Sequence, residues 1–294
     1  MLTVLESIKL STEYLQSKGI ESPRINAELL LANILNCKRL DIYLKFDQPL
    51  KEDEIKIYQE YIRRRGKFEP LQYIIGSVEF FGLEFKVNKS VLIPRPETEI
   101  LVETVISSVP KEELVKILDI GTGSGNIAIS LAKSLLNTKI TAIDNSPEAL
   151  GIAKENAKLN SVEERIEFVN ESILMDNNYS TKKYDIIVSN PPYVPASEFQ
   201  NLQPELKVYE PRIALTDEND GFSFFRIISS KSKSILKEKG KLFFEVGKDQ
   251  FQKVEEILNE NNFKNITVKK DYQNIERVIY GEFEPEAHPP LEEI

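Results

Sequence analysis

The sequence predicts an α/β protein with a doubly wound sheet of seven strands, preceded by a small helical domain and a linking β-hairpin. Apolar residues in the first 70 positions recur at helical spacing, whereas the later chain alternates apolar strand-like runs with helical stretches. Such alternation is typical of parallel βαβ units whose helices cover both faces of one sheet. We expect domains at 1–70 and 91–283, a hairpin linker at 71–90 and a flexible tail at 284–294.

Residues 1–70 are predicted to form a bundle of helices. The run from Ala27 to Leu35 is densely apolar, and turn-forming residues at 19–23 and 47–49 separate the helices. The last helix ends in four cations, namely Arg63, Arg64, Arg65 and Lys67. Cations there complement the helix dipole, so a solvated helix end is the simpler interpretation. Docking of an acidic partner is the functional alternative.

The segment YIIGSVEFFGLEFKV, residues 73–87, alternates around Gly76 and Gly82 and predicts the hairpin. In the second domain we expect strands at 116–120, 140–143, 166–169, 185–188, 242–246, 266–270 and 275–281. We expect helices at 97–109, 126–136, 147–160 and 221–238. A sheet of this kind opens its ligand crevice at the carboxyl ends of the strands.

Composition excludes several classes of function. The formal charge of −9 argues against a broad basic face for nucleic acid, and no apolar run approaches the roughly 18 residues of a membrane span. One cysteine, Cys37, excludes an internal disulfide, and one histidine, His288, leaves too few soft ligands for zinc and no histidine-centred triad. The N-terminus has no signal-peptide pattern. We therefore expect a cytoplasmic protein without a bound metal.

A glycine turn follows the first strand of the predicted sheet. Its residues are Gly121, Thr122, Gly123, Ser124 and Gly125, and a helix begins directly after them. Alternate glycines let the backbone pass close to a ligand, and the helix start supplies free N–H groups. A tight strand-to-helix turn without a ligand is the plainer interpretation.

Asp144 ends the next strand, where a carboxylate can accept hydrogen bonds from both ribose hydroxyls of a nucleoside cofactor. Its alternative role is a helix cap, although Ser146 fills that role well. The sixth position of the glycine turn is Asn126, so the pattern is GxGxG and the dinucleotide fingerprint GxGxxG is not met. This favours S-adenosylmethionine, with NAD as the second candidate.

The sequence SNPPYV follows the strand at 185–188 and predicts the reactive part of the site. Proline has no N–H, so Asn190, Pro191 and Pro192 present carbonyl oxygens without adjacent donors. The side-chain oxygen of Asn190 and the carbonyl of Pro191 could together hold an NH₂ group, with Tyr193 stacked over a planar amide or base. Oxygens on both hydrogens stabilise the nitrogen as it becomes tetrahedral and cationic during attack on a methyl sulfonium.

Six segments resemble the release factor glutamine methyltransferases. They are LIPRPETE (92–99), LDIGTGSGNIAISLA (118–132), DIIVSNPPYV (185–194), YEPRIAL (209–215), DGFSFFR (220–226) and LFFEVGKDQ (242–250). The resemblance covers about residues 68–281 and implies a Rossmann-like class I methyltransferase sheet. It implies methyl transfer from S-adenosylmethionine to the glutamine amide in the GGQ motif of peptide chain release factors, which would be the protein partners.

The resemblance also assigns residues. Gly121 to Gly125 would line the methionine end of the cofactor and Asp144 would hold its ribose, while Asn190, Pro191, Pro192 and Tyr193 would hold the glutamine. Glu171 and Ser172 stand where many members carry an aspartate and an aromatic residue that contact adenine. We expect Arg95 and Glu97 to structure the site, and the helical domain to dock the protein substrate.

Two other functions compete with this one. A nucleic-acid methyltransferase could use the same turn on an exocyclic amine of adenine, cytosine or guanine, but such enzymes add a basic recognition region. Residues 1–70 carry 12 basic and 11 acidic side chains, a net charge of +1, so no direct nucleic-acid contact is expected. A non-enzymatic cofactor-binding scaffold would keep the glycine turn and Asp144 but would have no use for Asn190.

Overall fold

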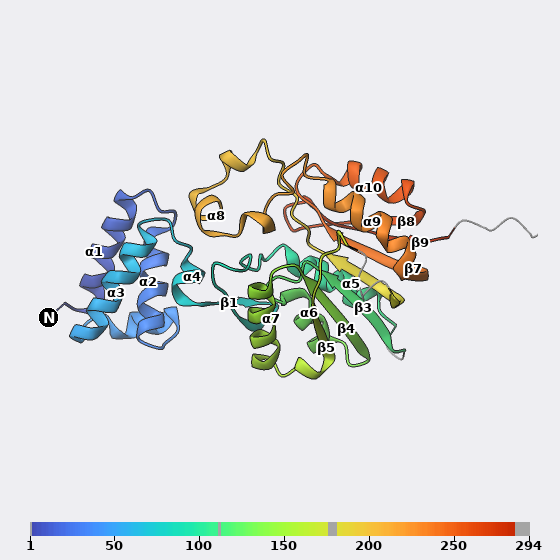
Figure 1. Ribbon diagram of the computed structural model, residues 1–294. Coiled ribbons are helices and arrows are strands. Elements are labelled where there is room, and N and C mark those ends of the chain that lie inside the picture. Colours follow the sequence, from blue (N-terminus) through green and yellow to red (C-terminus); the bar gives the residue numbers. More distant parts are fainter. Residues whose placement is uncertain (1, 111–112, 176–180, 286–294) are drawn as a thin grey trace, which may run out of the picture. The chain divides into compact units, whose positions relative to one another are not determined.

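The computed structural model describes residues 2–110, 113–175 and 181–285 (Figure 1). The chain divides into two compact units, one formed by residues 1–77 with 203–209 and the other by residues 78–202 with 210–294. The predicted tail falls mostly outside the described residues, as does His288. Within the described ranges, no helix is long and apolar enough to cross a membrane.

The first unit consists of helices. They are α1 (Val4–Ser17), α2 (Pro23–Ile34), the 3₁₀ helix η1 (Arg39–Lys45), α3 (Glu52–Arg65), α4 (Leu71–Ile75) and α8 (Pro204–Tyr209). Thr3 and Glu6 form a capping box that starts α1. The core of the unit contains Leu15, Leu30 and Leu31, which are fully buried, so the bundle has a hydrophobic centre of its own.

The cations at the end of α3 are largely engaged within this unit. Arg63 forms an ion pair with Glu60, and Arg64 forms one with Glu69. The buried Arg65 donates to Asn26 Oδ1 at 2.8 Å and to Glu205 Oε1 at 2.8 Å, so it ties α3 to α2 and α8. Three guanidinium groups of this cluster thus have carboxylate partners, but the Arg63–Glu60 pair is exposed and therefore weak, so docking of an acidic partner here stays a prediction.

The predicted hairpin is shorter than the sequence indicated. Residues 71–75 form α4, which ends at Gly76 with a φ of 89°, and only the following residues form β1 (Ser77–Phe80) and β2 (Leu83–Lys86). Glycine accepts this left-handed conformation without a steric cost, so it ends the helix here. The aromatic and β-branched residues at 73–75 favour a strand in sequence, but in the structure Tyr73 and Ile74 are buried as part of a helix.

The second unit contains the predicted seven-stranded sheet. Its strands are β3 (Val115–Ile120), β4 (Thr138–Asp144), β5 (Ile166–Asn170), β6 (Tyr184–Ser189), β7 (Leu236–Glu245), β8 (Phe263–Lys270) and β9 (Glu276–Phe283). The order across the sheet is β5-β4-β3-β6-β7-β9-β8. The first five strands in this order are parallel to one another, and β9 is antiparallel to both β7 and β8. The fold class is confirmed.

Helices cover both faces of the sheet (Figure 1). They are α5 (Thr98–Ser108), α6 (Asn126–Ser134), α7 (Pro147–Leu159), α9 (Ser223–Ile235) and α10 (Phe251–Glu260), with 3₁₀ turns η2 (Glu163–Arg165), η4 (Phe199–Asn201) and η5 (Arg212–Ala214). Successive residues of β3 enter different cores: Ile117 packs with α5 and α6, whereas Leu118 packs with α9 and α10. The prediction of a helix to 238 was too long, because Leu236 already pairs with β6.

The strand order places a ligand crevice at one edge of the sheet. From β3 the chain moves outward through β4 and β5, and then returns to β6 on the other side of β3. Ile120 and Ser189 are register partners, so β3 and β6 end side by side. A doubly wound sheet binds ligands where the strand order reverses in this way.

Candidate active site

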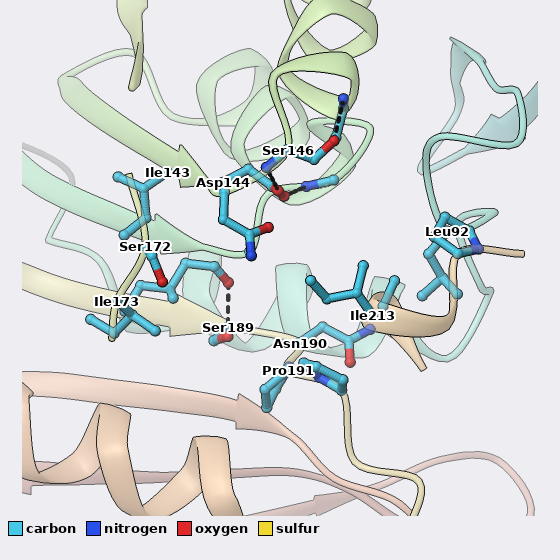
Figure 2. A pocket seen from close by; sticks show the side chains of 18 of the residues that line it. Leu92, Ile143, Asp144, Ser146, Ser172, Ile173, Ser189, Asn190, Pro191 and Ile213 are labelled. Atoms are coloured by element: carbon cyan, nitrogen blue, oxygen red, sulfur yellow. Dashed lines mark hydrogen bonds between the residues drawn. The ribbon is translucent and has the colours of Figure 1, made fainter. Parts of the chain in front are cut away.

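A cavity of about 340 Å³ lies at the carboxyl ends of β3, β4, β5 and β6 (Figure 2). Its walls come from the turns after these four strands, together with residues 90–92, Pro211, Ile213, Ala214 and two side chains of α9. All of these residues belong to the second unit. The site therefore needs no contribution from the helical unit in order to form a cavity.

Two glycines of the turn after β3 line this cavity. Gly121 has a φ of 73° and Gly123 a φ of 55°, and a Cβ built on either would meet no other atom within 4 Å. The space beside them is therefore open, and the backbone can lie directly against a ligand there.

The other three residues of the glycine turn shape it from behind. Thr122 is buried and donates from Oγ1 to Asp119 Oδ2 at 2.6 Å. Ser124 is also buried, and Gly125 has a φ of 80°, a left-handed conformation that favours glycine. Thr122, Ser124 and Gly125 do not line the cavity, whereas Gly121 and Gly123 do.

Asp144 lies in the cavity wall and is held by two backbone amides. Its Oδ2 accepts from the N–H of Gly123 and its Oδ1 from the N–H of Ser146, each at 2.9 Å. Ser146, not Asp144, caps α7, since its Oγ accepts from the Ala149 N–H at 3.1 Å. Burial raises the pKa of Asp144, and the backbone hydrogen bonds oppose that rise. The carboxylate is fixed in place and keeps further lone pairs for a ligand.

The third wall follows β5. Glu171 and Ser172 both line the cavity, and Figure 2 shows Ser172 near Ile173 and near Ile143, which lies at the end of β4. An apolar wall with polar groups beside it suits a flat heterocycle. The sequence analysis did not predict these isoleucines as cavity residues, because an apolar residue at the end of a strand has the same sequence pattern as a residue of the hydrophobic core.

The turn after β6 carries the predicted reactive residues. Ser189 Oγ donates to the Ile120 carbonyl at 2.8 Å and fixes the end of β6 against β3. Asn190, Pro191 and Pro192 line the cavity, and Asn190 Nδ2 donates to Thr98 Oγ1 at 3.3 Å. Within the described part of the chain, nothing donates to Asn190 Oδ1 or to the Pro191 carbonyl. Two acceptors are left for a ligand.

Tyr193 differs from the expectation. It does not line the cavity, and its ring packs against the core beneath α9 and α10. Its carbonyl accepts from Gln250 Nε2 at 2.9 Å, its hydroxyl lies 3.5 Å from Glu245 Oε1, and burial raises its pKa. In this conformation the tyrosine supports the turn from behind, and its stacking role over the substrate stays a prediction.

An ion pair joins two of the sequence motifs. Arg95 Nη2 lies 2.5 Å from Glu210 Oε1, and Glu210 Oε2 accepts from the Ile93 N–H at 3.3 Å. The side chain of Glu210 is only 1% exposed. This contact holds LIPRPETE against YEPRIAL and brings Leu92 and Ile213 into the cavity wall. Arg95 fits its expected structuring role, whereas the role of Glu210 was not predicted from the sequence.

Comparison with known proteins identifies the family. The family models for the PrmC N-terminal domain and for the methyltransferase small domain match residues 6–76 and 96–206. The release factor glutamine methyltransferase of Fusobacterium nucleatum is 40% identical over 94% of this chain and 77% of the relative. That of Geobacter sulfurreducens is 37% identical over 95% of this chain and 96% of the relative.

Solved structures support the fold. The hMettl16 catalytic domain, crystallised in complex with the MAT2A 3′UTR hairpin 6, has a TM-score of 0.54 at 20% identity and covers 82% of this chain and 85% of its own. A methyltransferase from Pyrococcus furiosus has a TM-score of 0.51 at 17% identity, over 70% of this chain and 91% of its own. The resemblance inferred from the six sequence segments is confirmed, and the chain belongs to the release factor glutamine methyltransferase family.

Proposed function

We propose that this chain transfers a methyl group from S-adenosylmethionine to the side-chain amide nitrogen of the glutamine in the GGQ motif of peptide chain release factors. Membership of the family supplies the reaction class, methylation of a release factor glutamine. The observation that carries the assignment of the site is the pair of acceptors at the end of β6, Asn190 Oδ1 and the Pro191 carbonyl, which receive no hydrogen bond from the described residues.

The cavity fits S-adenosylmethionine in three respects. Gly121 and Gly123 leave open space against the backbone, the fixed carboxylate of Asp144 can accept from ribose hydroxyls, and apolar walls at Ile143 and Ile173 suit adenine. The GxGxG pattern has no glycine at the position that a pyrophosphate cradle requires, which argues against NAD. When bound, this cofactor supplies a methyl group activated by a positively charged sulfur.

Asn190 and Pro191 would act on the substrate amide. An amide nitrogen is a poor nucleophile because its lone pair is delocalised into the carbonyl. Two fixed oxygens that accept from both N–H groups favour the tetrahedral, positively charged form that the nitrogen adopts as it gains a methyl group. The stabilisation comes from positioned dipoles, so a histidine base is not required.

Nucleic-acid methylation is the less favoured function. Its chemistry would be the same, but the helical unit is close to neutral and three of its clustered arginines are paired with carboxylates. A protein that grips a phosphate backbone needs unpaired cations along the contact.

The test offers the full chain three substrates: a purified release factor, total RNA and DNA, each with methyl-labelled S-adenosylmethionine. We expect label only in the release factor, located by mass spectrometry on the GGQ glutamine, and none in a release factor whose GGQ glutamine is replaced by alanine. Label in RNA or DNA, or on another residue of the release factor, would overturn the proposal.

A further inference from the structure

A buried hydroxyl lies behind Asn190. Thr98, the first residue of α5, is 1% exposed, and its Oγ1 accepts from Asn190 Nδ2 at 3.3 Å. A hydroxyl has one proton to donate as well as lone pairs that accept. Because Thr98 is buried, that proton requires an acceptor inside the protein.

The buried carboxyl of Glu245 is the group that this hydroxyl acts on, because burial raises the pKa of Glu245 and hydrogen bonding from the Thr98 side chain lowers it. It ends β7, the strand beside β6, and is 2% exposed. Its Oε1 lies 3.5 Å from the Tyr193 hydroxyl, and among the described residues its Oε2 has no hydrogen-bond partner. Buried polar atoms in proteins are nearly always hydrogen-bonded, so a buried carboxylate oxygen without a partner calls for a structural or functional explanation. Glu245 was not among the predicted site residues, and it does not line the cavity.

The arrangement decides which way the Asn190 amide turns. If the Thr98 proton goes to Glu245, the Thr98 oxygen can only accept, so the NH₂ of Asn190 faces Thr98 and its Oδ1 faces the cavity. Without Glu245, the Thr98 proton would go to Asn190 Oδ1 instead. The amide would then present its NH₂ to the substrate, where two NH₂ groups cannot hydrogen-bond to each other.

We propose that Glu245 is a positioning residue that, through Thr98, keeps the Asn190 oxygen turned toward the substrate amide. The inference rests on the proposed role of Asn190. It adds a buried Glu–Thr–Asn relay behind the reactive turn, in which Glu245 itself touches neither substrate nor cofactor.

The relay has a pH signature. Burial raises the pKa of Glu245 to about 7, against hydrogen bonding from Thr98 and Tyr193 and the positive charge of Arg277, while the negative charge of Glu97 adds to the rise. These groups come from α5 and the turn before it, the turn after β6, and β9. Only the ionised carboxylate accepts from both hydroxyls, so kcat should rise as the pH increases through about 7.

The experiment measures kcat and KM of the full chain with a release factor and labelled S-adenosylmethionine. Thr98→Val removes the hydroxyl at nearly constant shape, and we expect kcat to fall about 10- to 100-fold while KM for the cofactor changes less than about twofold. Thr98→Ser restores the hydroxyl and should recover most of the lost kcat. Glu245→Gln keeps a carbonyl acceptor, so kcat should stay within about tenfold of the wild type while the inflection near pH 7 disappears.

A double-mutant comparison separates the relay from ordinary packing. Thr98→Val combined with Glu245→Leu should lose no more than about threefold beyond the worse single variant, because both break one relay. Circular dichroism and calorimetric binding of S-adenosylhomocysteine check that each variant folds; if Glu245→Leu does not, the Thr98 pair and Glu245→Gln decide the question.

An unchanged kcat in Thr98→Val, fully multiplicative losses in the double variant, or a persisting inflection in Glu245→Gln would overturn the inference. The result for Asn190→Ala separates this failure from that of the proposed function. If Asn190→Ala is inactive while Thr98→Val is normal, only the relay fails. If both are normal, the role of Asn190 fails as well.

Discussion

The two sides of the cavity treat their polar groups in opposite ways. On the side of β3 and β4, both carboxylate oxygens of Asp144 already accept backbone hydrogen bonds at 2.9 Å. On the side of β6, Asn190 is anchored only through its NH₂, and in the described ranges its oxygen receives no donor. One side is therefore preorganised to bind and the other keeps acceptors for the substrate. Removal of the Asp144 carboxylate should weaken cofactor binding, and removal of the Asn190 amide should slow turnover.

The largest expected effect is that of Asn190→Ala on turnover. Its oxygen is needed mainly in the transition state, so we expect kcat to fall about 10²- to 10³-fold while cofactor affinity changes less than about threefold. Steady-state kinetics and calorimetry measure the two quantities. Asn259→Ala, at an exposed position in α10 away from the cavity lining, is the control and should behave as wild type. Similar losses in affinity and kcat would contradict the division between the two sides.

Asp144→Ala should show the reverse pattern. Removal of the carboxylate leaves the N–H groups of Gly123 and Ser146 without their acceptor and costs about 1–3 kcal/mol of unfolding free energy. Cofactor affinity should fall at least about tenfold because ribose contacts are lost as well. Urea unfolding and calorimetry measure these changes. An unaltered affinity for the cofactor would contradict the proposed role of Asp144 in binding its ribose.

The same carboxylate gives a pH dependence of binding. Burial raises the pKa of Asp144, so protonation begins at a higher pH than for an exposed aspartate. A protonated carboxyl accepts fewer hydrogen bonds, and cofactor affinity should therefore decrease as the pH falls. Asp144→Asn, which cannot titrate, should lose this dependence. Equal pH profiles in the two proteins would contradict the assignment.

Arg95→Ala tests the contact that closes the cavity wall. The buried Glu210 would keep only its weak bond from Ile93, and we expect about 1–3 kcal/mol less unfolding free energy. Arg226→Ala is the matched control, since its ion pair with Asp220 is half-exposed and worth less than about 1 kcal/mol. Equal losses in the two variants would show that the Arg95 pair does not hold the motifs together.

The smallest expected effects are those of alanine substitutions at two glycines, Gly121 and Gly151. Gly121→Ala places a side chain at a φ of 73° and costs about 1–2 kcal/mol, with its Cβ directed into open space beside the cavity. Gly151 lies exposed in α7 with no atom near an added Cβ, so Gly151→Ala should add about 0.5–1 kcal/mol and leave cofactor affinity unchanged. Thermal unfolding measures whether each variant is stabilised or destabilised. Stabilisation by Gly121→Ala would contradict the left-handed conformation of Gly121 in the turn after β3.

Local patterns were enough to predict the sheet and much of its ligand edge. The seven strands were predicted correctly because apolar runs alternate with stretches of helical spacing along the chain. Gly121, Asp144 and Asn190, which line the cavity, were predicted because they end a strand or directly follow one. Topology then brings such residues together whatever their separation in sequence.

What escaped prediction depends on contacts between distant segments. Glu210 reaches Arg95 across 115 positions and Glu205 reaches Arg65 across 140 positions, and nothing local to either residue reveals its partner. Tyr193 follows two prolines in the motif, but packing beneath α9 and α10 turns its ring away from the cavity. The contacts of the side chains behind the site therefore could not be predicted from local sequence patterns.

A crystal structure of the chain with S-adenosylhomocysteine and a release factor tests the central claim most directly. The account predicts that the amide nitrogen of the GGQ glutamine lies within about 3.2 Å of both Asn190 Oδ1 and the Pro191 carbonyl. A glutamine amide bound elsewhere in the cavity, or an Asn190 oxygen directed toward Thr98, would contradict it.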